Sequence, residues 1–230
     1  MKIMDSNQYD NLEWDKQGAL NSPSRKLFRT YIEKILGDLT GKSVLDVGSG
    51  VGHLFPLLQS KGAKYILGID PSEKNITESL KIFPAVDVVK TTFEDFKAEK
   101  KFDAIIFLLS SEHVESLKEV FQKSFSLLST YGTLILLTLD KEYEESQRFN
   151  YTVTLKLKGS DESIVEVTRP AGTMTSMVRS KDYILKTAAD NHFKIKKEIG
   201  IYPTNEFILE EPKYGPYKER RICYLFKFKK

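Results

Sequence analysis

Composition places the chain among ordinary globular proteins. Of its 230 residues, 40% are hydrophobic and 29% are charged, which argues against long disordered segments and allows one sizeable core. The formal net charge of +3, the balance of 35 basic and 32 acidic side chains, excludes a strong overall attraction to nucleic acid or to an anionic membrane. Cys223 is the only cysteine, so neither an intrachain disulfide nor a cysteine-based metal cluster can form.

Targeting and membrane signals are not apparent in the sequence. Residues 1–7 lack the apolar stretch of a secretory signal, and no later apolar run approaches the roughly 20 residues that a membrane helix needs. We therefore expect an unprocessed cytoplasmic protein with a single domain, present as a monomer or a homodimer and not associated with membranes.

The first predicted helix begins at Ser22-Pro23, where serine supplies an N-cap and proline takes the first helical position. Apolar residues at helical spacing follow from Leu27 to Leu36, and Gly37 is suited to end the helix. Residues 1–40 are therefore expected to form an N-terminal helical cap ahead of the first strand.

From residue 43 onwards, short apolar runs alternate with helical segments. This alternation is typical of a parallel sheet covered by helices on both faces, here over residues 41–140. One helix is expected from Glu112 to about Leu128, ended by Tyr131-Gly132. The expected strands are 43–47, 65–69, 86–89, 102–107 and 133–139.

The alternation is interrupted over residues 141–180. Two apolar segments, Thr152 to Leu157 and Ile164 to Thr168, flank the turn-forming sequence Gly159-Ser160-Asp161. The pattern predicts an inserted hairpin.

The last part of the chain, residues 181–230, is expected to contain a helix and two strands. Ser180 caps the helix through Ala189, and Asn191 is suited to the left-handed conformation that ends it. Strands are expected at 193–199 and 222–228. The proline-containing segment between them shows no helical periodicity, so an antiparallel return is favoured over another crossover.

The most informative motif is the glycine-rich loop after the first strand, Asp46-Val47-Gly48-Ser49-Gly50-Val51-Gly52. Glycines at alternate positions permit a sharp turn from strand to helix and let a ligand approach the backbone closely. The helix that follows directs unpaired N–H groups at the loop, which favours an anionic group such as a carboxylate. A nucleotide-like ligand is indicated, with glycines that only permit tight packing as the alternative.

An acidic residue, Asp70, ends the second expected strand about 20 residues after the first glycines. In a right-handed βαβ unit the ends of these two strands lie side by side, so this carboxylate can reach the ribose hydroxyls of the ligand. The dinucleotide fingerprint G-x-G-x-x-G is not met, because His53 stands where the third glycine would be. A nicotinamide cofactor is therefore disfavoured.

These motifs resemble those of the class I S-adenosylmethionine-dependent methyltransferases, specifically small-molecule members. The resemblance rests on Asp46, Gly48, Gly50 and Gly52 and covers residues 41–139, and more loosely the final strand pair. It implies an α/β fold: a Rossmann-like, seven-stranded, mostly parallel sheet with an antiparallel last strand and helices on both faces. It also implies S-adenosylmethionine as cofactor and S-adenosylhomocysteine as product, with no metal.

The resemblance further assigns cofactor contacts. Asp46 and the loop, Ser49 included, would face the methionine part, and Asp70 followed by Pro71 would hold the ribose. After the third strand, one register places Thr92 and Phe93 beside the adenine, whereas a slip of two or three residues would use Glu94 or Asp95. The backbone of Leu108 and Leu109, at the end of the fourth strand, would meet the methionine amine. The implied cofactor residues are Asp46, Gly48, Ser49, Gly50, Gly52, Asp70, Pro71, Thr92, Phe93, Leu108 and Leu109.

Residues for catalysis and for the methyl acceptor are also implied. His113 aligns with a histidine of small-molecule members and is a candidate base, with packing near the cofactor as the alternative. Arg179 is a possible anchor for an anionic substrate or an exposed, solvated arginine. Tyr9, Trp14 and Arg25 in the N-terminal cap are candidate acceptor contacts, because the cap and the hairpin lie outside the core alternation.

The expected function is methyl transfer to oxygen or nitrogen of a small molecule. The chain shows no appended nucleic-acid module, and Leu108-Leu109-Ser110-Ser111 does not match the motif of methyltransferases that act on RNA bases. The alternatives are an RNA or protein methyltransferase and a catalytically silent cofactor-binding protein. No nucleic-acid partner is expected.

Overall fold

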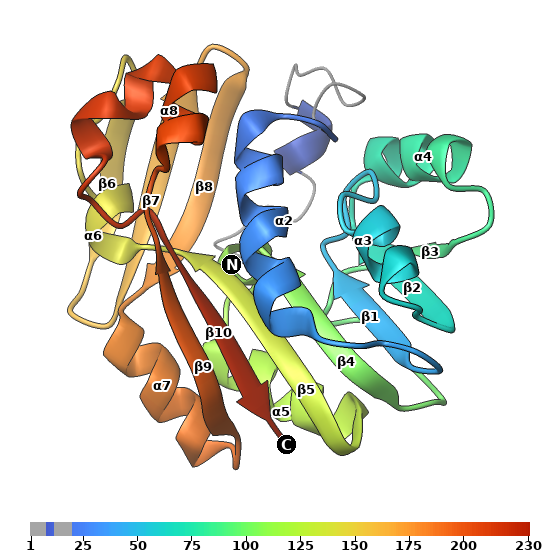
Figure 1. Ribbon diagram of the computed structural model, residues 1–230. Helices are drawn as coiled ribbons and strands as arrows, with labels where there is room; N and C mark the ends of the chain where they lie inside the picture. The colour runs from blue at the N-terminus through green and yellow to red at the C-terminus, as the bar shows by residue number, and fades with distance from the viewer. Residues whose placement is uncertain (1–7, 12–19) are drawn as a thin grey trace.

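The computed structural model describes residues 8–11 and 20–230. A seven-stranded sheet in the order β3-β2-β1-β4-β5-β10-β9 forms the centre of the described chain (Figure 1). Its strands are β1 (Ser43–Val47), β2 (Tyr65–Asp70), β3 (Asp87–Lys90), β4 (Phe102–Leu108), β5 (Leu128–Leu139), β9 (Lys194–Ile201) and β10 (Cys223–Lys229).

Strands β1 to β5 are parallel, whereas β10 runs antiparallel to both β5 and β9. The expected Rossmann-like sheet with an antiparallel last strand is thereby confirmed. The helical elements are η1 (Gln8–Asn11), α2 (Pro23–Leu36), α3 (Phe55–Ser60), α4 (Glu73–Ile82), η2 (Ser111–His113), α5 (Leu117–Leu127), α6 (Lys141–Glu144), α7 (Lys181–Asp190), α8 (Asn205–Glu210) and η3 (Pro212–Tyr217).

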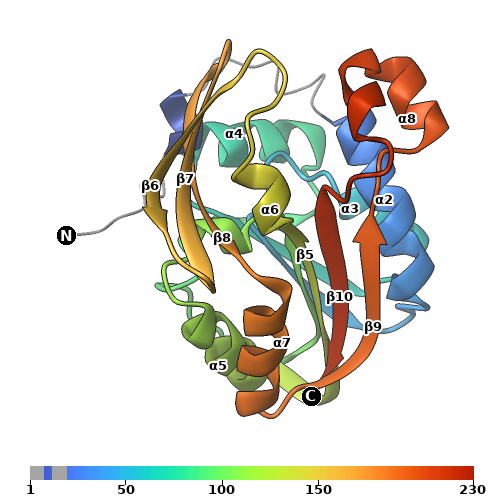
Figure 2. The ribbon, with the colours of Figure 1, turned by 90° about the vertical axis from the view of Figure 1, so that its left-hand side faces the viewer.

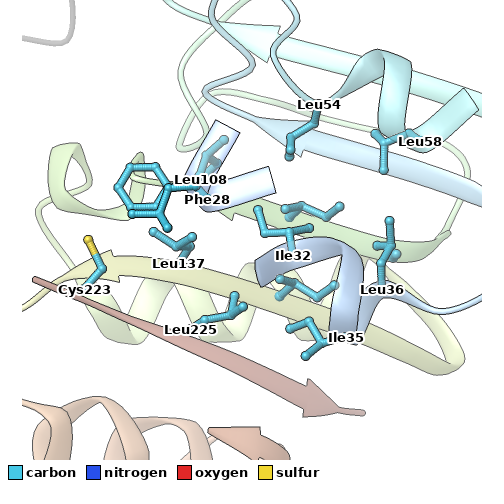
Figure 3. Close-up of a cluster of buried hydrophobic side chains, with 14 of the residues drawn as sticks. Phe28, Ile32, Ile35, Leu36, Leu54, Leu58, Leu108, Leu137, Cys223 and Leu225 are labelled. Carbon is cyan, nitrogen blue, oxygen red and sulfur yellow. The ribbon is translucent and has the colours of Figure 1, made fainter. Parts of the chain in front are cut away.

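Each face of the sheet packs against its own helices because successive strand side chains point to opposite faces. On one face, α2 and α3 cover alternate residues of the strands, and Figure 3 shows Ile32 beside Leu137 and Leu225, with Leu58 farther along the same cluster. On the other face, α5 and α7 cover a core rich in phenylalanine. Helix α2 has the predicted bounds, with Pro23 in its first turn and Gly37 at φ +76° after its last, although the Ser22 side chain at its N-cap makes no capping hydrogen bond.

The inserted segment differs from the predicted hairpin. It forms a second, antiparallel three-stranded sheet, β6 (Thr152–Lys158), β7 (Glu162–Arg169) and β8 (Gly172–Arg179) (Figure 2). The first two strands match the expected pair. The third strand, β8, was not predicted because its sequence lacks strict apolar alternation; it pairs along its length with β7 and packs near η2.

Three other predictions need correction. The segment before β10 contains the short helix α8, capped by Thr204, although it lacks helical periodicity. Helix α5 begins only at Leu117, after the separate turn η2. The left-handed residue after α7 is His192, at φ +65°, and not Asn191, at φ −108°. Within residues 8–11 and 20–230, no helix is long and apolar enough to cross a membrane.

Candidate functional site

A first cavity lies at the carboxyl ends of β1, β2 and β4, where the chain leaves the sheet. Its volume is about 960 Å³, including the mouth open to solvent. The lining residues are Tyr9, Arg25, Asp46, Val47, Gly48, Ser49, Gly50, Val51, His53, Leu54, Ile69, Asp70, Pro71, Asn75, Thr91, Thr92, Phe93, Glu94, Leu108, Leu109, Ser110, His113 and Val114.

The glycine loop after β1 is fastened to the end of β2. The N–H groups of Gly48 and Ser49 both donate to the carbonyl of Ile69, at 2.8 and 3.0 Å. Gly48 has φ +69°, and a Cβ there would overlap the Cβ of Ser110 at the end of β4. Gly50, at φ +57°, donates its N–H to Asp70 Oδ2 at 2.9 Å. The loop therefore needs glycine both for its backbone angles and for its contact with β4.

Asp70 is held at the cavity wall by its own neighbours. Its side chain belongs to a residue only 6% exposed, and Oδ1 accepts from Ser72 N at 2.9 Å and from Asn75 Nδ2 at 3.2 Å. Ser72 also caps helix α4, so the carboxylate and the start of that helix are positioned together. Asp70 faces the first cavity and not bulk solvent, as the motif predicts.

Asp46 is a buried carboxylate with an unsatisfied atom. The strand alternation directs its side chain to the face covered by α2, the helix that carries Arg25. Its Oδ1 has no hydrogen-bond partner within the described part of the chain. Burial and, to a smaller extent, the negative charge of Asp70 raise the pKa of Asp46 to about 7, against the opposing charge of Arg25. A cationic group of a ligand would stabilise this carboxylate.

Gly52, one of the expected cofactor residues, lies outside the lining of the first cavity. Its φ is +93°, and a Cβ there would come within 2.7 Å of the rings of Phe55 and Phe83. Packing behind the loop accounts for this glycine, and its contact with the cofactor stays a prediction.

The structure shows which residues of the segment after β3 lie near the cavity, and so bears on the alternative alignments of this segment with the adenine site. Thr92, Phe93 and Glu94 all line the first cavity, whereas Asp95 does not. Asp95 instead bonds back to Thr92, with its N–H 3.1 Å from Thr92 Oγ1 and its Oδ2 accepting from that hydroxyl at 2.9 Å. The slip that would use Asp95 is therefore not supported.

The end of β4 carries unusual backbone geometry. Leu109 has φ +54°, a conformation that costs a residue with a Cβ about 1–2 kcal/mol. Its N–H is held by the carbonyl of Leu137 at 2.9 Å, and Ser110 Oγ donates to the carbonyl of Val47 at 2.5 Å. These bonds to β5 and β1 keep the strained turn at the cavity wall, where non-glycine left-handed residues are often functional.

His113 lies in η2 and is bonded through both ring nitrogens. The backbone of Thr175 orients the Gln8 amide, since Thr175 N donates to Oε1 at 2.8 Å and Nε2 donates to Thr175 O at 3.0 Å. The same Nε2 lies 3.0 Å from His113 Nδ1, so this ring nitrogen acts as the acceptor. The proton is then on Nε2, which lies 2.7 Å from the hydroxyl of Tyr9. Burial lowers the pKa of His113 to about 4, so the ring is neutral at pH 7.

Two buried side chains hold the turn that carries His113. Glu112, which is 1% exposed, accepts from Thr138 Oγ1 and Leu139 N, both at 2.7 Å. Arg179, 2% exposed, donates to the carbonyls of Ser111 and Val114 at 2.7 Å each.

Arg179 also pairs with Glu162 at 2.8 Å and lines neither cavity. Both expectations for it, a substrate anchor and an exposed arginine, are corrected: Arg179 is a buried clamp between β8 and η2. Trp14, another predicted acceptor contact, lies outside the described residues.

A second cavity adjoins the first and shares four residues with it, Tyr9, Arg25, Leu109 and His113. The remaining lining comes from α2, β5, α6, the second sheet, η3 and the start of β10. Its other lining residues are Ser22, Ser24, Phe28, Leu139, Tyr143, Glu144, Arg169, Met174, Ser176, Tyr214, Ile222 and Cys223. Two predicted acceptor contacts, Tyr9 and Arg25, thus lie on the shared wall.

Sequence reasoning missed several lining residues. His53 lines the first cavity, and burial lowers its pKa to about 2, so it is neutral. Asn75 could have been inferred from its place in the first turn of α4, the helix that follows Asp70. Tyr143 and Arg169 of the second cavity carry no motif, because only the packing of α6 and the second sheet brings them to the site.

The strand order and the glycine loop at the carboxyl end of β1 define a class: the Rossmann-like methyltransferases that use S-adenosylmethionine. A sequence family described as methyltransferase domain matches residues 21–186, so the chain belongs to that family. The protein is an S-adenosylmethionine-dependent methyltransferase.

Several relatives are ubiquinone biosynthesis O-methyltransferases. That of Bradyrhizobium sp. (strain ORS 278) is 25% identical over 225 residues, covering 90% of this chain and 81% of the relative. That of Bradyrhizobium diazoefficiens is 26% identical over 170 residues, covering 72% of this chain and 64% of the relative. That of Actinobacillus pleuropneumoniae serotype 7 is 30% identical over 162 residues, covering 61% and 68%.

Solved structures share the fold. A protein from Listeria monocytogenes, assigned as an S-adenosylmethionine-dependent methyltransferase, has a TM-score of 0.73 at 23% identity, covering 87% of this chain and 96% of its own. An S-adenosylmethionine-dependent methyltransferase from Mesorhizobium loti has a TM-score of 0.70 at 18% identity, with the same coverage.

Proposed function

We propose that the first cavity binds S-adenosylmethionine and that the second binds a small-molecule methyl acceptor. The observation that carries the first part is the buried, unsatisfied Oδ1 of Asp46 beside a loop whose glycines leave room for a ligand. A carboxylate that is costly to bury alone fits a ligand with an ammonium group. The amino-acid tail of S-adenosylmethionine supplies one.

The proposed contacts with the ribose and the adenine of the cofactor follow from where the lining residues lie in the first cavity. Asp70, fixed by Gly50, Ser72 and Asn75, is placed to accept hydrogen bonds from ribose hydroxyls at the end of β2. Thr92, Phe93 and Glu94 line the part of the cavity after β3, and the ring of Phe93 packs edge-to-face on Phe107. The adenine would lie against this segment.

When bound, S-adenosylmethionine supplies a methyl group activated by its sulfonium, so the protein's task is mainly to align the acceptor and exclude water. Tyr9, Arg25, Leu109 and His113 lie where the cavities meet and would contact the acceptor at its reacting end. With its proton on Nε2, neutral His113 donates to the Tyr9 hydroxyl. His113 therefore acts as a positioning residue for Tyr9 in the tautomer that Gln8 selects.

The acceptor is proposed to be a small molecule because the second cavity is a confined space lined by α2, α6, the second sheet and η3. The relatives in ubiquinone biosynthesis, which are O-methyltransferases, support an oxygen nucleophile. Within residues 8–11 and 20–230, no group of three or more His, Cys, Asp or Glu side chains could hold a metal ion. The chemistry proposed for these residues needs none.

We also propose that residues 1–230 act as one domain. In this arrangement the segments 1–40 and 141–180 form the lid over the acceptor, and 41–140 carries the cofactor contacts. The protein would work in the cytoplasm as a monomer or homodimer, without nucleic acid or membrane.

Calorimetry with S-adenosylmethionine, S-adenosylhomocysteine and NAD tests the cofactor. We expect the first two to bind and NAD not to bind. Methyl-labelled S-adenosylmethionine incubated with a small-molecule extract should then give a labelled product of low mass. Binding of NAD alone, or label found only in protein or RNA, would contradict the proposal.

A further inference from the structure

The second cavity is lined by the cation of Arg169, which forms no ion pair with a carboxylate in the part of the chain that the structure describes. Arg169 lies at the end of β7, beside the two-residue connection to β8. Its Nε is buried and has no hydrogen-bond partner within the described part of the chain. The guanidinium carbon lies 5.3 Å from the centre of the Tyr151 ring, a contact that positions the group without giving its Nε a hydrogen-bond acceptor.

A second unsatisfied donor lines the same cavity. Tyr143, in α6, is only 4% exposed, and its hydroxyl has no hydrogen-bond partner among the described residues. The ring is held between Tyr217, edge-on at 5.6 Å between ring centres, and the guanidinium of Arg148 at 4.8 Å. A buried hydroxyl that is rigidly held and unpaired is costly unless a ligand completes its hydrogen bond.

The acidic residues around the cavity are already paired. Glu144 lines the cavity, but its Oε2 lies 2.5 Å from Arg148. Asp140, which precedes α6, pairs with Arg221 at 2.7 Å. Neither carboxylate therefore pairs with Arg169. The positive charge of Arg169 acts on the phenols of Tyr9 and Tyr214, where it opposes the rise in pKa caused by burial.

Much of the remaining lining is apolar and includes two aromatic rings. Phe28, Leu139, Met174, Tyr214 and Ile222 line the cavity alongside the polar groups. Such walls favour a flat ring, because ligand sites combine apolar lining with a few convergent polar groups. One guanidinium and one hydroxyl together match the two oxygens of a single carboxylate.

We propose that the methyl acceptor is a small aromatic carboxylate whose carboxylate is bound by Arg169 and by the hydroxyl of Tyr143. This inference rests on the proposed function. The two anchoring residues line only the second cavity, whereas the shared wall at Tyr9 and His113 is left to the reacting group. The anchor would thus select the acceptor by charge and fix which ring substituent meets the methyl group.

Calorimetry on the enzyme saturated with S-adenosylhomocysteine tests the anchor without turnover. The probes are 3-hydroxybenzoate, 4-hydroxybenzoate and 4-hydroxycinnamate, each compared with its neutral carboxamide. At least one carboxylate should bind roughly ten- to a hundredfold more tightly than its amide, the range expected for a charge-assisted hydrogen bond. Arg169→Gln should remove this preference, Arg169→Lys should keep part of it, and Tyr143→Phe should weaken carboxylate binding several-fold.

Arg29→Gln is the matched control, because it also removes one arginine but lies outside the lining of both cavities. It should retain the carboxylate preference. Equal binding of acids and amides, no binding of any probe, or a preference that survives Arg169→Gln in a folded variant would overturn the anchor. Failure of S-adenosylhomocysteine to bind the unmodified enzyme would instead refute the proposed function itself.

Discussion

Substitution of Gly48 by alanine tests whether the glycine loop is packed as the structure shows. Alanine at φ +69° carries a backbone cost of about 1–2 kcal/mol. In addition, its methyl group would overlap Ser110 Cβ and lie 3.1 Å from Ser110 Oγ. Moving Ser110 away would break its hydrogen bond to Val47, worth about 1 kcal/mol. The expected loss of stability is therefore about 2–3 kcal/mol.

Gly41→Ala separates the two contributions. Gly41 has φ +76°, but a Cβ there meets nothing within 4 Å, so only the backbone cost of about 1–2 kcal/mol applies. Both variants should be compared by urea unfolding and by calorimetry with S-adenosylhomocysteine. Gly48→Ala should be the less stable by about 1 kcal/mol and lose at least tenfold in affinity, whereas Gly41→Ala should bind normally. Equal stability and equal affinity would refute the contact between the loop and Ser110.

Three further predictions concern charge. Because the pKa of Asp46 is about 7, affinity for S-adenosylhomocysteine should rise as the pH rises from 6 to 8 and its carboxylate ionises; calorimetry on Asp46→Asn should show weaker binding without this rise. Burial lowers the pKa of His113 from its ordinary value of 6.5 to about 4, so this residue is protonated in the unfolded chain before it is protonated in the folded protein. As the pH falls from 6.5 towards 4, the free energy of unfolding should therefore decrease by up to about 3 kcal/mol. Urea unfolding at pH 4.5 and 7 should show a flatter dependence for His113→Asn, and an unchanged slope would contradict the buried neutral ring. Arg179→Met should destabilise by about 2–4 kcal/mol, since it orphans the carbonyls of Ser111 and Val114; intact stability with weaker acceptor binding would return Arg179 to a substrate role.

The residues of the proposed cofactor site could largely be predicted from the sequence, because the motifs that indicate them are local. A strand, alternating glycines, a second strand and a terminal Asp70 occur in order along about 30 residues, and their spatial meeting follows from the handedness of one βαβ unit. The same reasoning assigned Gly52 to the ligand, because a glycine required by packing and one required by a cavity look alike in sequence.

The residues of the proposed acceptor site were less predictable, because they come from separated segments of the chain. Arg169 and Tyr143 line one cavity only because α6 packs against the second sheet. The sequence predicts that Arg179 is exposed or ligand-binding, because its neighbours along the chain do not reveal the three backbone carbonyls and Glu162 that surround it in the fold. Strand β8 was missed because its partner strand, and not its own apolar pattern, determines its conformation.

The position of β10 has a consequence for how the protein is made. Strand β9 has β10 as its sheet partner, and β10 also covers the edge of β5. During synthesis, β1 to β5 can therefore assemble while β9 still has no strand to pair with. The apolar edge of β5 remains unpaired until residues 223–229 leave the ribosome. A nascent or truncated chain that stops short of β10 should be prone to aggregate through that edge, even with its glycine loop already formed.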